Sequence, residues 1–163
     1  ELHQPYENLT YYGRGPFENY IDRYSGAFIG RYEDKVENQF YWYIRPQETG
    51  NKTDVRWLTL LDSGGLGVKI TGLQPISFSA LHFSPEDLDP GLTRKLQHTI
   101  DIVPQKNIFL HVDLKQRGLG GDNSWGMYPH NEYRLLDKKY TYSYMIELVE
   151  KGSDKNDYLN SRK

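Results

Sequence analysis

The feature that most constrains the fold of this chain is an apolar pattern with a period of two, interrupted by glycine and proline. Residues 53–62 predict a strand whose alternate side chains share one face: Val55, Trp57, Thr59 and Leu61. Residues 63–65 (Ser-Gly-Gly) predict a turn, after which residues 66–71 return as the hairpin partner. Similar stretches predict further strands at 76–83, 108–117, 132–136 and 140–149. Such strands with turn signals between them are typical of an antiparallel, all-β sandwich.

One short helix is expected within this strand pattern. Ser84 is a favourable N-cap, Pro85 suits the first helical position, and Glu86 and Asp87 place negative charge in the first turn. Residues 90–91 (Pro-Gly) should end the helix within about two turns. The last two strands are expected to pair with each other through a turn at 137–139.

Length and composition predict a single domain and exclude several functional classes. The 163 residues are assigned to a domain at 1–150 and a polar tail at 151–163 that we expect to be disordered. With a net charge of −2 the chain has no basic field for nucleic acid, and no apolar stretch approaches a membrane span. The absence of cysteine excludes disulfides and thiolate chemistry, and the five scattered histidines predict no metal site.

Residues 118–125, Gly-Leu-Gly-Gly-Asp-Asn-Ser-Trp, form the most informative segment for function. Three glycines allow sharp backbone turns, and the side chains of Asp122, Asn123 and Ser124 can hold such turns through hydrogen bonds. Trp125 follows directly, and its flat ring could stack on a sugar or a base. The alternative is that Trp125 fills the core at a strand end. We expect Trp125 to be exposed to solvent and Trp42 and Trp57 to be largely buried.

Three segments resemble the C-terminal domain of glycoside hydrolase family 2 β-galactosidases. Residues 118–125 resemble the family's Gly-Gly-Asp-(Asp/Asn)-Ser-Trp signature, and residues 11–23 resemble its Gly-x-Gly-Pro-x-Glu-Asn-Tyr-x-Asp-Arg block. Between them, residues 45–50 resemble its Pro-x-Glu-x-Gly turn. The resemblance covers residues 5–150 and implies the small-chain β-sandwich domain, a supersandwich similar to galactose mutarotase. Because that domain normally begins upstream of Glu1, we expect this chain to carry its later strands.

The resemblance also implies a division of labour in a larger enzyme. In the family, hydrolysis of terminal β-D-galactosides with retention uses two glutamates of a separate (β/α)₈ barrel, which lie about 5–5.5 Å apart. This chain lacks the barrel pattern, so it should contain no catalytic residue and be inactive alone. Trp125 would bind the substrate sugar in the completed pocket, with Asp122, Asn123 and Ser124 supporting it.

The implied partners are a β-galactoside and the other domains of the parent enzyme, the barrel above all. No cofactor is expected in this chain, and the resemblance allows Mg or Na ions in the parent enzyme. The compartment stays open between bacterial cytoplasm and periplasm.

A second dense group of polar residues lies at 13–23. Gly13, Gly15 and Pro16 are expected to form a tight turn, after which mixed charges can pair across it. We favour a structural role over sugar binding for the whole group: Gly13, Arg14, Gly15, Pro16, Glu18, Asn19, Tyr20, Asp22 and Arg23.

Two other functions are compatible with the sequence. A free-standing carbohydrate-binding module could use the aromatic run at 41–43 (Tyr-Trp-Tyr) together with Trp125. A mutarotase-like aldose epimerase would need an acid and a histidine at one sugar, for which Glu132 with His111 or His82 is the candidate pair. Glu18 and Glu48 also lie in motif segments, and we expect structural roles for them and for Glu132.

Overall fold

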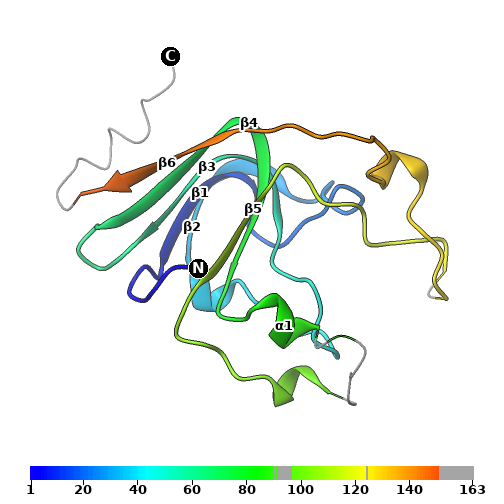
Figure 1. Ribbon diagram of the computed structural model, residues 1–163, viewed down its shortest axis with the longest axis horizontal. Helices are drawn as coiled ribbons and strands as arrows, with labels where there is room; N and C mark the ends of the chain where they lie inside the picture. The colour runs from blue at the N-terminus through cyan, green and yellow to red at the C-terminus, as the bar shows by residue number, and fades with distance from the viewer. Residues whose placement is uncertain (90, 92–96, 124, 151–163) are drawn as a thin grey trace.

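The computed structural model describes residues 1–89, 91, 97–123 and 125–150, and these residues are nearly all β (Figure 1). The strands are β1 (Asn8–Gly15), β2 (Phe28–Lys35), β3 (Lys52–Leu61), β4 (Gly67–Leu81), β5 (Phe109–Asp113) and β6 (Tyr144–Val149). They form one antiparallel sheet in the order β2-β1-β3-β4-β5, with β6 paired to β4. The all-β prediction is confirmed, and a curved six-stranded sheet is consistent with an all-β sandwich. The predicted tail at 151–163 lies outside the described residues.

The short helix begins where the sequence predicts. In α1 (Pro85–Leu88), the Ser84 hydroxyl accepts a hydrogen bond from the Asp87 amide at 3.2 Å, and the Ser84 amide donates to the Asp87 carboxylate at 2.8 Å. These two reciprocal bonds satisfy the backbone amides of Ser84 and Asp87 at the start of the helix. Single 3₁₀ turns occur at η1 (Val36–Asn38), η3 (Thr99–Asp101) and η4 (Asn131–Tyr133). None of the helices in the described part of the chain is long and apolar enough to cross a bilayer.

Strand β4 runs continuously through two stretches that the sequence predicts as separate strands, at 66–71 and 76–83. Residues 67–72 pair with β6, whereas residues 77–81 pair with β5, and both halves also pair with β3. Gly72 and Pro75 resemble strand breaks in sequence, but here the strand continues through them. At Gly72 a Cβ would lie 2.3 Å from the Gln74 carbonyl oxygen, so a side chain there would collide with the backbone.

The predicted inward face of β3 is wrong beyond Val55. The pairing of β3 with β4 shifts register on both sides of Val55, and Asp54 has a positive φ of 52°. Such an irregularity adds a residue to one strand and reverses the side-chain alternation after it. Val55 is therefore buried together with Leu58 and Leu60, while Trp57 is directed to the opposite face.

Of the three tryptophan predictions, burial of Trp42 is wrong, whereas Trp57 is partly buried but lies outside the main core. Trp57 is partly exposed and stacks on Tyr12, with 6.5 Å between ring centroids. Trp42 is 66% exposed and contacts the Phe40 ring edge-on at 5.0 Å. The prediction for Trp125 is confirmed, because this side chain is 92% exposed.

Strand β1 continues through the residues predicted as a tight turn. Gly13, Arg14 and Gly15 lie in the strand, and the chain turns after them at Pro16. The glycines are needed for close packing, because a Cβ at Gly13 would lie 2.6 Å from the Val55 side chain. A Cβ at Gly15 would lie 2.2 Å from the Tyr11 hydroxyl.

The predicted hairpin of 132–136 with 140–149 does not form. Residues 131–133 make the η4 turn, and β6 begins at Tyr144 and pairs with residues 67–72 of β4. The Tyr133 carbonyl accepts a hydrogen bond from the Gly118 amide instead of a strand partner. Strand β6 therefore pairs with β4, which is distant in sequence, and not with the neighbouring residues 132–136.

The main core lies on one face of the curved sheet. Its buried side chains come from β1, β3 and β4, from η1 and from the residue before β5: Leu9, Tyr11, Val36, Val55, Leu58, Leu60, Ile70, Ile76, Phe78, Ala80 and Ile108. Tyr11 of β1 meets Phe78 of β4 edge-on at 5.3 Å, which closes the curve over this core. A second cluster beside α1 comprises Phe40, Leu81, Phe83, Leu88 and Ile102. The segment between β5 and β6 projects away from the strands (Figure 1).

Candidate functional site

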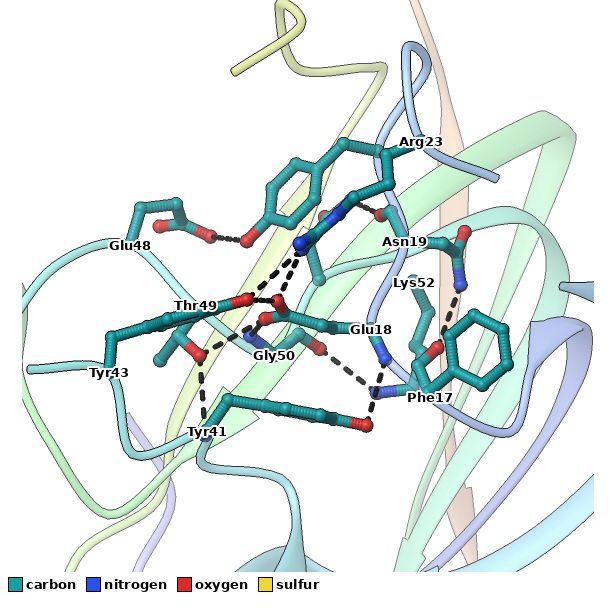
Figure 2. A network of polar contacts seen from close by, with 12 residues as sticks. Phe17, Glu18, Asn19, Arg23, Tyr41, Tyr43, Glu48, Thr49, Gly50 and Lys52 are labelled. Carbon is teal, nitrogen blue, oxygen red and sulfur yellow. Dashed lines mark hydrogen bonds and ion pairs between the residues drawn. The ribbon is translucent and has the colours of Figure 1, made fainter. Parts of the chain in front are cut away.

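The carboxylate of Glu18 is the centre of a buried polar network (Figure 2). One oxygen accepts hydrogen bonds from the Arg23 guanidinium at 2.5 Å and from the Tyr43 hydroxyl. The other accepts from the Thr49 hydroxyl at 3.1 Å and the Gly50 amide at 2.8 Å. Glu18 is only 4% exposed, so these donors replace the water that an ionised carboxylate needs.

Asn19 and Arg14 attach the same segment to strand β3. The Asn19 amide oxygen accepts from the Thr53 amide at 3.0 Å, and its backbone amide donates to the Asn51 carbonyl at 2.8 Å. The Arg14 guanidinium is 2.5 Å from the Asp54 carboxylate and lies 4.4 Å from the centre of the Tyr24 ring. Both contacts hold residues 14–19 to the sheet.

Tyr20 connects this segment to the 45–50 turn. Its hydroxyl donates to the Glu48 carboxylate at 3.4 Å, and the ring is fully buried. Burial raises the pKa of Tyr20 well above its usual value, with the charge of Glu48 acting in the same direction. Loss of water contact also raises the pKa of Glu48, against the opposing effects of Gln116 and His111.

Asp22 connects the same segment to the glycine-rich octet. Its carboxylate accepts a hydrogen bond from the Gly120 amide at 2.7 Å. A Cβ at Gly118 would lie 2.7 Å from this carboxylate and 2.9 Å from the Cβ of Tyr133, so only glycine fits there. The Gly118 amide donates to the Tyr133 carbonyl at 2.7 Å. All three segments of the resemblance therefore converge on Glu18, Tyr20 and Asp22.

Residues 118–133 form a closed loop that presents Trp125, and we call it the Trp loop. Its two ends meet at the hydrogen bond from Gly118 to Tyr133. The Trp125 amide donates to the Asn123 side chain at 2.8 Å, and Gly126 follows with a φ of 99° that other residues rarely adopt. Because backbone bonds hold the loop while the indole is free, Trp125 is available to stack on a ligand. The predicted role of Ser124 falls outside the described residues.

A shallow hollow of about 650 Å³ lies beside Trp125. It is lined by residues of the Trp loop and its outgoing arm: Asp122, Gly126, Met127, Tyr128, Pro129, His130, Asn131, Glu132 and Arg134. Two of the lining residues, Asp122 and His130, contact each other directly, with 2.7 Å between the carboxylate oxygen and Nε2. The Arg134 guanidinium lies 5.0 Å from the centre of the Tyr128 ring.

The acids that the structure places near His82 and His111 differ from the sequence expectation. His82 is 3.1 Å from Glu7, and the charge of His111 acts on Glu48. Glu132 instead lies in η4, at the hollow beside Trp125. Among the described residues, no three His, Cys, Asp or Glu side chains gather as a metal site requires.

Several residues of the network carry no local sequence signal. Tyr41 and Tyr43 belong to an aromatic run, but the Tyr41 hydroxyl accepts from the Glu18 amide at 3.0 Å and Tyr43 donates to the Glu18 carboxylate. Lys52 is buried and donates to the Gln39 amide oxygen at 2.9 Å. His130, which contacts Asp122, lies five residues after Trp125. Its closeness to the octet in sequence is the one feature that could have predicted a role for it.

Comparisons with known proteins match most of this chain to β-galactosidases. Residues 1–146 match the family model described as the β-galactosidase small chain. A β-galactosidase of Priestia megaterium is 37% identical over 147 residues, which cover 90% of this chain and 14% of that protein. A β-galactosidase of Streptococcus thermophilus is 38% identical over 144 residues, covering 87% and 14%. One of Halalkalibacterium halodurans is 35% identical over 136 residues, covering 83% and 13%.

The chain thus spans about one seventh of the length of these relatives. The match covers the three motif segments and the whole described sheet up to the middle of β6. On this evidence the chain belongs to the β-galactosidase small-chain family.

Proposed function

We propose that this chain is the small-chain domain of a retaining β-galactosidase and that it completes the sugar pocket with Trp125. The hydrolysis of terminal β-D-galactosides is assigned to two glutamates on a barrel domain elsewhere in the parent enzyme. The Trp loop would contribute an apolar ring that aligns the sugar without charge. Asp122 and Asn123 would support the loop.

The observation that carries this proposal is the contrast between Trp125 and its surroundings. The indole is 92% exposed, yet the loop that bears it is held by Asp22, Tyr133 and Asn123. An exposed tryptophan on an anchored loop is suited to contact another domain or a ligand, because its flat apolar face is accessible and the backbone that carries it is held in place. The names of the relatives support galactosides as the substrate class.

The acidic residues of this chain support the assignment of catalysis to another domain. Glu18 is buried and its carboxylate accepts four hydrogen bonds, three from side chains and one from the Gly50 amide, so it has no free lone pair for a substrate. The Glu18 contacts also weaken the carbohydrate-module alternative, because Tyr41 and Tyr43 use their hydroxyls there. Trp42 is the remaining exposed ring of that aromatic run.

The test is Trp125→Ala in the full-length protein, with a chromogenic β-galactoside as substrate. Stacking beyond burial contributes about 1 kcal/mol, and tenfold in affinity corresponds to about 1.4 kcal/mol, so KM should rise by about fivefold. The thermal midpoint should stay unchanged, because an exposed ring contributes little to the core.

Trp42→Ala is the matched control, because Trp42 is also an exposed tryptophan but lies outside the Trp loop. It should leave KM unchanged. Equal KM values for the wild type and Trp125→Ala would contradict the proposal. A thermal midpoint that falls strongly in Trp125→Ala would instead show a structural role for the ring.

A further inference from the structure

The Trp loop is closed at two levels. At its base, the Gly118 amide donates to the Tyr133 carbonyl at 2.7 Å, and Asp22 accepts from the Gly120 amide. Nearer its tip, Asp122 and His130 are 2.7 Å apart, and we call this contact the tip pair. Asp122 precedes Trp125 and His130 follows it, so the tip pair ties together the two arms that carry the indole.

We propose that His130 is a positioning residue for Trp125, which holds the tip of the Trp loop through Asp122 more firmly when its imidazole is protonated. The inference rests on the proposed function, since it concerns how the Trp loop presents its ring to a sugar. His130 itself is not assigned a contact with substrate.

The charges around His130 favour its protonated form. Asp122 faces it through the hydrogen bond, and Glu132 of η4 adds a second negative charge, and together they raise the pKa of His130. Arg134 lines the same hollow, but its guanidinium lies over the Tyr128 ring and donates to Asn131 at 3.3 Å.

The tip pair is expected to act locally and not on global stability. Both side chains are exposed, so water and salt screen their attraction. The Trp loop has few buried contacts of its own, because its residues from Leu119 to Tyr128 are exposed wherever the structure describes them. Small local energies decide the mobility of such segments.

The direction of the pH effect follows from the raised pKa. At low pH the imidazolium holds Asp122 with a charge-assisted hydrogen bond. This contribution is complete below the ordinary histidine pKa of about 6.5 and is lost as pH rises through the raised value. The Trp loop should therefore loosen as the solution becomes alkaline.

The first test uses the 163-residue chain and needs no activity. Backbone ¹⁵N relaxation at the Trp125 amide should show increasing mobility as the pH rises from 5.5 to 8.5 in the wild type. In His130→Gln the amide should be mobile at every pH. In Asp122→Asn the transition should move to lower pH, because the stronger of the two influences that raise the pKa of His130 is gone and only Glu132 remains.

His98→Gln is the matched control, because His98 is an exposed histidine 3.9 Å from Asp101 and lies outside the Trp loop. It should keep the wild-type transition. An unchanged Trp125 amide across this pH range, or the same transition in His130→Gln, would overturn the proposal.

The second test uses the full-length protein and separates KM from kcat. KM for a chromogenic β-galactoside should rise with pH over the range in which the Trp125 amide becomes more mobile. His130→Gln should remove this pH-dependent rise in KM and keep the pH profile of kcat. If Trp125→Ala leaves KM unchanged, the proposed function fails, whereas the relaxation result still decides the tip pair. A KM step that persists in His130→Gln would reject the positioning role.

Discussion

At the residue scale, Lys52 shows how burial converts one side chain into a pH-dependent element of stability. Its ammonium donates to the Gln39 amide oxygen at 2.9 Å and the Gly50 carbonyl at 3.1 Å, and the residue is 1% exposed. Burial lowers the pKa of Lys52 to about 8, although Glu18 and Asp34 act in the opposite direction. Between this value and about 10.4, the unfolded chain binds more protons than the folded chain, so stability rises with pH.

We therefore expect the free energy of unfolding of the wild type to rise by about 2 kcal/mol between pH 7 and 9.5 relative to that of Lys52→Met, since each pKa unit corresponds to about 1.36 kcal/mol. Urea denaturation across this range measures the difference. Lys106→Met, at an exposed lysine, serves as the control and should show no such gain. Parallel pH curves for the wild type and Lys52→Met would contradict the assignment.

At the element scale, the register shift in β3 decides which side chains support the core. Leu58 is fully buried, whereas Trp57 lies on the other face against Tyr12. Leu58→Ala should cost about 2–5 kcal/mol of unfolding free energy, as other large-to-small core changes do. Trp57→Ala should cost about 1 kcal/mol, because a partly exposed ring loses less burial. Chemical denaturation of both variants of the isolated chain compares them, and an equal loss would place Trp57 in the core.

At the scale of the whole molecule, the glutamates of the motif segments and of η4 occupy three different surroundings. Glu18 is buried in its network, Glu48 is held by Tyr20, and Glu132 lies in η4 beside the Trp loop. We expect the isolated chain not to hydrolyse a chromogenic β-galactoside, because retention requires two carboxylates set close together around the sugar. Turnover by a preparation free of host enzyme, at a rate that Trp125→Ala does not change, would contradict both this expectation and the proposed function.

The local properties of this protein follow from its sequence alone. Alternation and turn residues determined the all-β class, and Ser84 and Asp87 determined the start of α1. These features depend on neighbours a few residues away, so a pattern within a short window specifies them. The motif segments also indicated the family, because their residues are recognisable without coordinates.

Only the tertiary structure decided the features that depend on partners distant in the chain. The shift near Val55 moved Trp57 to the outer face, and β6 paired with β4 instead of its neighbouring segment. The hydrogen bond from Gly120 to Asp22 joins residues 98 positions apart, and it makes the 13–23 segment the support of the Trp loop. Strand register, pairing and burial arise from competition among all available edges and faces, and no local pattern contains that competition.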